Sequence, residues 1–515
     1  MFRKILLTSV MIMGAVQAYA QLTPDYTHNA LLLSSQYYDG TARSLAIGNA
    51  MTALGGDLGA LSYNPAASGV YRYYEFTLTP SVYSSLSHSA FLDNVSSTGK
   101  SRFALSNVGW AGTFETGRTR GLLNFNLAIT ANQTNNFAYR SSGSGIQKSS
   151  SYLGYLAATM PDIPGSQLSM QDDYDDRPFY RDASWSQVLA WNTGMIDTLV
   201  GLHSTYIGAT ENISADGFFV PGTLVQDYYR EKTGYIQDIV INASGNVDNI
   251  FFFGVSVTLQ SIWMNEYTYI MERAADPSVF KTGFTDFTRE YQLTTSGVGV
   301  DISAGFLVRP VAGLTIGGSV STPDWMFLNE GWMETMSGYT AVYGHSTVNS
   351  PLGSYSYRIT APFKWNLGVG YTLGTLMAIG VDYERVDYST ITMASSGGNR
   401  SEFQYENDFI SKSFQAVNNV RAGLEIWPHS QLAVRLGYNY YSSSEKDYDN
   451  SRHYASAGLG YRNTRGFFLD LAYQQQCNFN NNEFALYGSY EGLTAPIASE
   501  NSLNWKILLT LGWRF

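Results

Sequence analysis

Residues 503–515 alternate between two kinds of side chain. Apolar side chains occupy every second position, at Trp505, Ile507, Leu509, Leu511, Trp513 and Phe515. Successive side chains of a β-strand point to opposite faces, so such a strand separates an apolar environment from a polar one. On the polar face only Leu508 breaks the pattern. The segment predicts the closing strand of a transmembrane β-barrel, which ends at Phe515.

The same alternation recurs earlier in the chain. Counting such segments predicts an all-β fold, a transmembrane barrel of fourteen antiparallel strands. The predicted strands are residues 71–87, 101–116, 120–137, 232–246, 249–272, 286–309, 313–321, 355–372, 375–392, 415–427, 430–443, 452–462, 466–478 and 503–515. A soluble β-sandwich can show the same period, but usually without so many aromatic residues at its strand ends. Charged residues make up 14% of the chain, against roughly 25% in soluble domains, which also favours the barrel.

The connections between the predicted strands alternate in length. Bacterial barrels have short periplasmic turns and long extracellular loops. The longest predicted outer loop, residues 138–231, holds an acidic cluster at residues 172–176 and a possible helix within Trp185–Leu199. We expect recognition in this loop, because binding residues often lie on loops. The short turns are predicted at residues 117–119, 247–248, 310–312, 373–374, 428–429 and 463–465.

The N-terminus has the pattern of a cleavable signal peptide. A basic pair at residues 3–4 precedes an apolar run over residues 5–16, and small residues follow shortly before Gln21. This pattern predicts a signal peptide at residues 1–20. The apolar run is too short for a helix that crosses a bilayer. A signal peptide followed by a barrel predicts export to the outer membrane of a Gram-negative bacterium.

The charge and the residue spacing exclude several kinds of partner and chemistry. Removal of Arg3 and Lys4 with the signal peptide changes the net charge from −11 to −13, which argues against a nucleic acid as partner. We expect contact with outer-membrane lipid and lipopolysaccharide, and with the barrel assembly machinery during biogenesis. The six histidines and the single Cys477 have no metal-ligand spacing, and no catalytic motif is present. The sequence therefore predicts no enzyme, no metal site and no cofactor.

Residues 21–70 precede the barrel and lack strand periodicity. The run from Ala42 to Leu61 is rich in Ala, Gly and Leu, which suits short helices and tight turns. A barrel of about fourteen strands is too wide for side chains alone to fill, so its lumen needs a plug or stays wet. We expect residues 21–70 to be that plug, here called the hatch.

The hatch carries a family resemblance. The run from Gly40 to Ala50, the segment Ala53–Asp57 and the triplet Asn64-Pro65-Ala66 resemble the hatch of the FadL/TodX outer-membrane transporters. That family is known for fourteen strands and an N-terminal hatch with an Asn-Pro-Ala motif. Here Ala67 stands where a glycine often follows.

The resemblance implies passive passage of hydrophobic compounds such as long-chain fatty acids or aromatic hydrocarbons. In that family the ligand is captured by outer loops, moves to a site inside the barrel and leaves sideways through a kinked early strand. The predicted third strand has neither Pro nor Gly between Leu122 and Phe137, whereas the second holds Gly109 and Gly112. The sequence therefore does not locate the lateral gate.

Candidate site residues fall into three groups, each with an ordinary structural alternative. In the hatch, Asn64, Pro65 and Ala66 form a ligand-sensitive turn or a plain one, and close packing is the favoured role of Gly48, Gly55 and Gly56. Inward-facing charges of both signs should mostly pair with each other, yet one or two of the basic ones could hold a ligand carboxylate. In the outer loop, aromatic residues could line a capture surface, although such residues are common in any barrel. The ligand-binding candidates are Arg309, Lys364, Arg421, Arg435, Trp185 and Trp191.

Three other functions remain as alternatives. Some relatives of the family are described as haemin receptors, and His203 or His345 could serve as an axial ligand. FadL-like barrels also include PorV, a secretion component that binds cargo, and the loop over residues 138–231 would suit such docking. A general porin is a third alternative, but the predicted hatch argues against an open channel.

Overall fold

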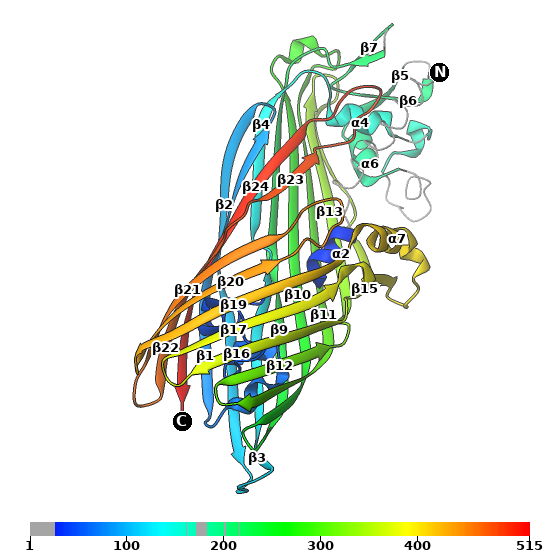
Figure 1. The fold of residues 1–515 in the computed structure, drawn as a ribbon. Coiled ribbons are helices and arrows are strands. Elements are labelled where there is room, and N and C mark those ends of the chain that lie inside the picture. The colour runs from blue at the N-terminus through cyan, green and yellow to red at the C-terminus, as the bar shows by residue number, and fades with distance from the viewer. Residues whose placement is uncertain (1–25, 161, 171–182, 200–201, 216) are drawn as a thin grey trace, which may run out of the picture.

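The computed structural model describes residues 26–160, 162–170, 183–199, 202–215 and 217–515. The predicted signal peptide and the acidic cluster at residues 172–176 lie outside the described residues. One tall β-barrel holds short helices in its lumen and carries a folded cap at one end (Figure 1). The C-terminus lies at the other end.

Fourteen antiparallel strands close the barrel, as the sequence predicts. Each strand pairs with the next one of this set, and β24 pairs with β1 to complete the ring. The strands are β1 (Glu75–Phe91), β2 (Asn94–Glu115), β3 (Leu122–Asn136), β9 (Leu224–Val247), β10 (Phe251–Ala274), β11 (Phe284–Val311), β12 (Leu314–Ser321), β16 (Lys364–Leu373), β17 (Met377–Asp387), β19 (Ala416–His429), β20 (Leu432–Tyr441), β21 (Arg452–Arg462), β22 (Phe467–Gln476) and β24 (Ile497–Arg514).

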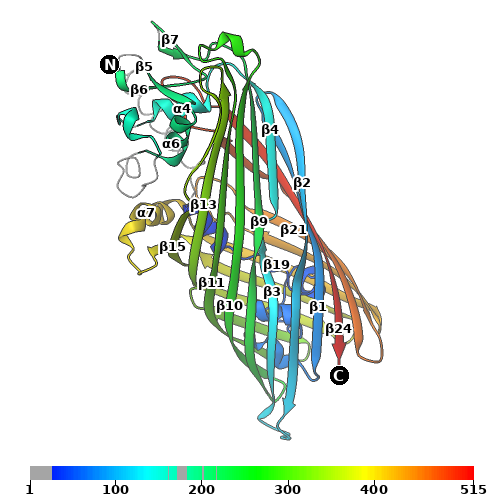
Figure 2. The ribbon, with the colours of Figure 1, turned by 180° about the vertical axis from the view of Figure 1, so that it is seen from behind.

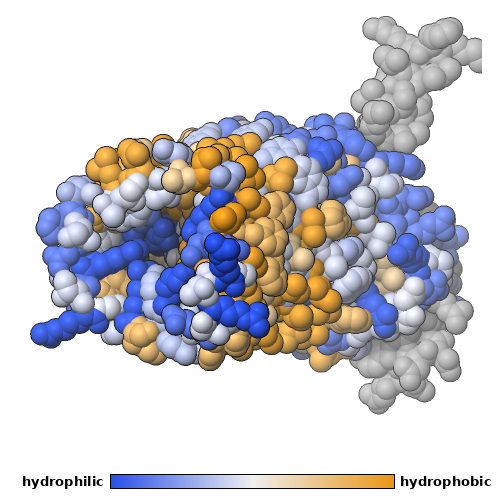
Figure 3. Space-filling model, turned by 60° about the horizontal axis from the view of Figure 1, so that its bottom comes forward, coloured by the Kyte–Doolittle hydropathy of each residue, from blue (hydrophilic) through white to orange (hydrophobic). Residues whose placement is uncertain are grey.

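The alternation of the sequence becomes an outer and an inner face of the wall. In β11, Val298, Ile302 and Phe306 are exposed, whereas Asp301 and Ser303 are buried on the lumen side. Figure 3 shows apolar residues as a broad belt around the middle of the molecule, with polar residues toward both ends. A barrel that lies in a bilayer needs such a belt.

None of the described helices combines the length and the apolar character that crossing a membrane requires.

The predicted strand over residues 355–372 is wrong as one element. β15 (Gly353–Thr360) ends before Ala361, and β16 begins at Lys364. Pro362 lies in this break, where its missing N–H cannot join a ladder. Consequently β15 pairs with β13 (Trp325–Thr340), whereas β16 pairs with β12 and β17.

Residues 322–354, predicted as a connection, form β13, β14 (Gly344–Asn349) and the first two residues of β15. The alternation is hidden in β13, because the buried Met326 and Leu328 alternate with the exposed Trp325 and Phe327, so that both faces are apolar. The predicted connection over residues 88–100 is also strand, since β1 and β2 meet in a tight hairpin at Leu92-Asp93. Three further strands extend the sheet: β4 (Tyr139–Gln147) on β9, β18 (Thr392–Ser395) on β15 and β23 (Asn480–Ala485) on β24.

The hatch consists of short helices inside the barrel, drawn in blue in Figure 2. It contains α2 (Tyr26–Ser34), α3 (Ala42–Ala46), η2 (Leu58–Ser62) and η3 (Pro65–Val70). Thr41, Asp57 and Asn64 cap the last three of these, each accepting a backbone N–H on its side-chain oxygen. The inward-facing Leu508, the exception in the C-terminal pattern, packs with Ala42, Leu45 and Ala46 of α3. That exception therefore belongs to the contact between wall and hatch.

The cap lies at the end of the barrel opposite the C-terminus (Figure 1). Apolar residues of α4 and α6, among them Leu153, Val188 and Leu189, pack in one cluster with Phe284 and Phe287 of β11. The helix predicted within residues 185–199 is shorter than expected and stops at Asn192. The elements of the cap are α4 (Tyr152–Ala158), η4 (Gly165–Gln167), α6 (Trp185–Asn192), β5 (Ile196–Leu199), β6 (Leu202–Gly208), β7 (Asn212–Ser214) and β8 (Gly217–Phe219).

The remaining short elements lie in other connections. α7 (Gln404–Ser413) packs against α2 at the rim of the barrel. The short helical turns are η5 (Pro277–Val279), η6 (Tyr388–Thr390) and η7 (Ser401–Phe403).

A buried carboxyl group ties the cap to a neighbouring loop. Glu211 is 5% exposed and accepts hydrogen bonds from the backbone N–H of Gly208 (3.2 Å) and from the hydroxyl of Tyr490 (3.0 Å). Burial, assisted by the negative charge of Glu491, raises the pKa of Glu211 to about 7. The folded cap therefore holds a proton on Glu211 at a pH where the unfolded segment has lost it.

We expect the cap to lose stability as the pH rises from about 4.5 to about 7, because only the unfolded state ionises in that window. Hydrogen–deuterium exchange of α4 and β6, corrected for intrinsic exchange, should show protection that falls across this range. In Glu211→Gln the fall should be smaller but not absent, because Glu272, which accepts hydrogen bonds from Ser151 and Tyr152 at the start of α4, also has its pKa raised to about 7 by burial. Equal pH dependence in both proteins would contradict the assignment to Glu211.

Candidate functional site

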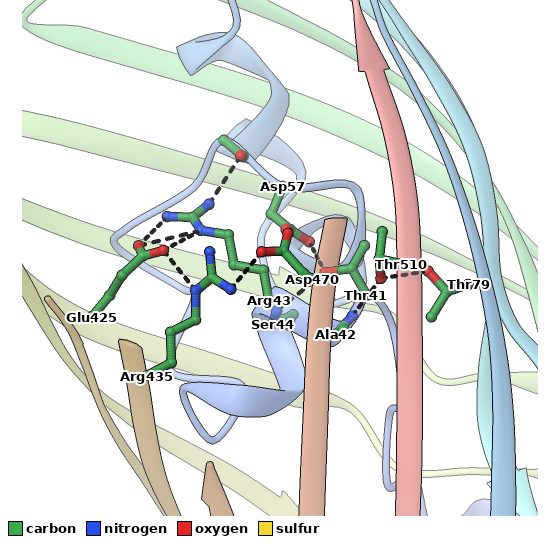
Figure 4. A network of polar contacts seen from close by, with 11 residues as sticks. Thr41, Ala42, Arg43, Ser44, Asp57, Thr79, Glu425, Arg435, Asp470 and Thr510 are labelled. Carbon is green, nitrogen blue, oxygen red and sulfur yellow. Dashed lines mark hydrogen bonds and ion pairs between the residues drawn. The ribbon is translucent and has the colours of Figure 1, made fainter. Parts of the chain in front are cut away.

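Buried ion pairs hold the hatch to the barrel wall (Figure 4). Arg43 of α3 donates from Nη2 to Oε2 of Glu425 at 2.8 Å, and Arg435 donates from Nε to Oε1 of the same carboxylate at 2.7 Å. Nη1 of Arg435 also donates to Asp470 at 2.5 Å. Two positive and two negative side chains thus compensate each other where water is excluded, and one positive side chain belongs to the hatch.

A second anchor lies where the barrel wall is interrupted. β1 and β24 pair continuously except at Thr79 and Pro80, and Pro80 has no N–H to offer. At this point the hydroxyl of Thr510 is 2.8 Å from that of Thr79 and accepts the N–H of Ala42 at 2.8 Å (Figure 4). The first turn of α3 therefore contacts the wall beside the gap in the ladder.

The Asn-Pro-Ala triplet packs the hatch against the opposite side of the wall. Asn64 donates from Nδ2 to the carbonyl oxygens of Thr52 (2.7 Å) and Phe306 (3.0 Å), and its Oδ1 accepts the N–H of Ala66 (3.0 Å). The carbonyl of Pro65 accepts a bond from Asn242 of β9 at 2.9 Å. These bonds occupy the polar atoms of the triplet with protein partners.

The hatch glycines allow a close approach of backbones. Gly48 has φ +62°, and a Cβ there would lie 2.8 Å from the backbone nitrogen of Tyr438 and 2.9 Å from the carbonyl oxygen of Ala422. Gly55 and Gly56 also have positive φ and face Val70 within the hatch. This geometry supports the packing role that the sequence favoured for these glycines.

Gly48→Ala should destabilise the barrel by clearly more than the roughly 1–2 kcal/mol that a left-handed alanine costs by itself, because the new methyl group meets the backbone of β20. Gly117→Ala is the matched control, since Gly117 has φ +72° and no atom near its added Cβ. Urea unfolding followed by tryptophan fluorescence measures both changes. Equal losses in the two variants would mean that the contact at Gly48 contributes nothing.

Arg435→Met should cost about 3–5 kcal/mol, the usual cost of removing one partner from a buried ion pair, because Asp470 and part of Glu425 lose their compensation. The exposed Arg465 in the turn after β21 provides the control, and Arg465→Met should unfold at the wild-type urea concentration. A wild-type midpoint for Arg435→Met would contradict this account of the anchor.

The basic ligand-binding candidates lie in separate places. Arg421 pairs with Glu384 at 3.0 Å, and Arg435 belongs to the hatch anchor. Lys364 donates to the hydroxyl of Tyr38 at 2.6 Å and lines a small cavity beside Asp301. Arg309 lies 4.8 Å above the ring of Phe252.

The two tryptophan candidates belong to the cap and not to the lumen. Trp191 makes an edge contact with Tyr206 at 6.0 Å between ring centroids, and Trp185 begins α6 and packs against the same apolar cluster. Of the residues that could bind haem, His345 lies in β14, and the side chain of His203 lies outside the described residues. The described residues contain no group of three or more His, Cys, Asp or Glu side chains placed to hold a metal ion.

A cavity above the hatch gathers residues that the sequence analysis missed. It has a free volume of about 60 Å³ and lies between the hatch segment Tyr37–Asp39 and several wall strands. Tyr37 makes an edge contact with Tyr441 at 5.1 Å, and Tyr441 makes one with Tyr454 at 6.0 Å. We call this cavity the tyrosine pocket; its lining residues are Tyr37, Tyr38, Asp39, Asn49, Tyr83, Asn135, Asn136, Tyr441, Arg452, Tyr454, Gln474, Asn504, Trp505 and Lys506.

Arg452 is the missed residue with the clearest chemical character. Its guanidinium group lies 4.6 Å from the centre of the Tyr37 ring. Arg452 stands opposite Tyr441 in the pairing of β20 and β21. The sequence could have indicated this site through an inward arginine that stands opposite a tyrosine. Recognising that pair requires the register of β20 and β21, which the sequence does not give.

The wall beside the tyrosine pocket is incomplete. β2 pairs with β3 only from Asn107 to Glu115, and along residues 94–106 no backbone pairing joins β2 to β3 or β4 in the part of the chain that the structure describes. Side chains bridge this seam instead, as in the bond from Oγ1 of Thr98 to the carbonyl of Arg140 at 3.3 Å. The seam adjoins the pocket because Asn135 and Asn136, at the end of β3, line it.

Searches with the sequence find no matching family model and no matching curated protein. The structure, in contrast, resembles solved outer-membrane proteins. A Pseudomonas aeruginosa FadL homologue superposes with a TM-score of 0.53 at 11% identity, covering 93% of this chain and 100% of that one. The Pseudomonas putida toluene transporter TodX gives a TM-score of 0.50 at 12% identity, covering 93% and 99%. The chain therefore has the fold of the FadL/TodX proteins, which its hatch motif predicted.

Proposed function

We propose that this protein is an outer-membrane channel for passive uptake of hydrophobic small molecules. One observation carries the proposal: a pocket between the hatch and the wall strands lies beside a seam in the barrel wall. A plugged barrel has no straight aqueous path, so a solute that enters the pocket needs a sideways exit. The similarity in fold to a toluene transporter and a FadL homologue supports this reading.

The lower end of the seam lies at the edge of the apolar belt. Asn136, the last residue of β3, pairs with Tyr235, which pairs with Trp263. Tyrosine and tryptophan mark the interface between membrane and water in such barrels. A solute that leaves the pocket here passes into the outer leaflet without crossing water, and no energy source is needed.

The proposed setting is the outer membrane of a Gram-negative bacterium, with the cap outside and the C-terminal end toward the periplasm. The signal peptide predicted for residues 1–20 would deliver the chain, and the barrel assembly machinery would insert it. Long-chain fatty acids and aromatic hydrocarbons are the two substrate classes that the family resemblance implies.

Expression in a Gram-negative host should increase uptake of labelled palmitate or naphthalene. The variant Ser96→Cys with Ser142→Cys should lower that uptake under oxidising conditions, because a disulfide would hold β2 against β4, where the hydroxyl of Ser96 already donates to the carbonyl of Ser142. Reduction should restore it. All variants carry Cys477→Ser, which removes the only native cysteine.

Leu436→Cys with Ala457→Cys is the control, since this pair faces outward on the continuous ladder of β20 and β21. Its oxidation should leave uptake unchanged. Absence of uptake across a panel of fatty acids and hydrocarbons would refute the transporter proposal. Co-purification of a protein cargo or of haem in place of uptake would favour the PorV-like or the haemin alternative.

A further inference from the structure

The lining of the tyrosine pocket is aromatic and polar, unlike that of a channel for alkyl chains. It is formed by five tyrosines, one tryptophan and polar or charged residues, with no aliphatic side chain among the described residues that line it. A long alkyl chain gains its binding energy from apolar contact area, which hydrated amide and charged groups do not provide. Flat aromatic rings, in contrast, pack on tyrosine faces and edges.

The pocket also carries an uncompensated positive charge. Lys506 pairs with Asp39, and Asp39 accepts further bonds from Ser106 (3.2 Å) and Gln133 (3.3 Å). Arg452 has no such partner, because no carboxylate forms an ion pair with it in the described part of the chain. The ionisable groups that surround Arg452 are the phenols of Tyr37, Tyr454 and Tyr83.

This arrangement differs from that of the arginines that fasten the hatch. Arg43 and Arg435 both reach Glu425, so their charges are neutralised within the protein. A guanidinium group that is left beside a cavity instead presents a fork of donors that matches the two oxygens of a carboxylate. The buried Nδ2 of Asn136 and Oδ1 of Asn504, both without partners in the described structure, add a donor and an acceptor to the lining residues.

We propose that the tyrosine pocket binds small aromatic acids, with the carboxylate on Arg452 and the ring against the tyrosine side chains that line the pocket. The inference rests on the proposed uptake function and specifies its substrate: a flat ring that carries an acid group rather than a long alkyl chain. The Asn136 and Asn504 amides would bind a hydroxyl group on the ring. Tyr37 belongs to the hatch, so an occupied pocket joins the hatch to the wall strands through the ligand.

The test compares three soluble probes on the full-length protein in lipid nanodiscs by calorimetry. 4-Hydroxybenzoate has both ring and charge, 4-hydroxybenzamide has the ring alone, and hexanoate has the charge alone. We expect 4-hydroxybenzoate to bind at one site at least about tenfold more tightly than either of the others, since one charge-assisted pair supplies that factor. Equal binding of hexanoate, or no binding of 4-hydroxybenzoate, would overturn the proposal.

Variants assign the two parts of the site. Arg452→Gln should abolish the preference for 4-hydroxybenzoate over the amide, and Arg452→Lys should keep part of it. Tyr37→Leu should reduce the preference over hexanoate. The control Arg465→Gln, in an exposed turn, should behave as wild type. An unchanged affinity of Arg452→Gln for 4-hydroxybenzoate, with a wild-type unfolding midpoint, would refute the role of Arg452.

Binding and uptake fail separately. If cells take up palmitate or naphthalene but the protein does not bind 4-hydroxybenzoate, the uptake function stands and the aromatic-acid site is refuted. If 4-hydroxybenzoate binds through Arg452 but expression changes no uptake, the site stands and the transport proposal fails.

Discussion

The buried charges of the lumen depend on one another across the contact between hatch and wall. Glu425 has no exposed surface and accepts bonds from Arg435 on the neighbouring strand and from Arg43 of the hatch. A carboxylate at such a place is tolerable only with partners, so the wall is electrostatically complete only with the hatch inside it. The hatch, in turn, is too short and too rich in small residues to bury a core of its own. Each part supplies what the other lacks.

Glycines make the close contact between hatch and wall sterically possible. The backbone of Gly48 lies against β20 so closely that a Cβ on Gly437 would come within 2.0 Å of the nitrogen of Gly48. Glycine therefore stands on both sides of the contact, at Gly48 and Gly437. Where tyrosines line the lumen in place of glycines, above the hatch, the structure has the tyrosine pocket.

Sequence reasoning located the barrel because a wall between lipid and lumen forces a period of two on every strand that it contains. Sequence reasoning missed the strands that do not show this period of two. In β13 both faces are apolar from Trp325 to Leu328, so no alternation marks the strand, and the Ser-rich ends of β1 and β2 have no apolar side to reveal them. The hatch motif could be found because it is local. The tyrosine pocket could not, since Tyr37, Tyr441 and Arg452 meet only after the register of β20 and β21 is fixed and the hatch is in place.

The ring is fastened by residues from opposite ends of the barrel sequence. The N–H of Tyr74 donates to the carbonyl of Phe515 at 2.9 Å, and the N–H of Phe515 donates back to Tyr74 at 3.0 Å. Contacts between residues so distant in sequence carry a large entropic cost of loop closure and tend to form late in folding. The hatch ends just before Tyr74, so the chain leaves the lumen at the junction of β1 and β24 that closes the barrel. The hatch must therefore lie inside the barrel before β1 and β24 pair, because a later insertion would require this pairing to open again.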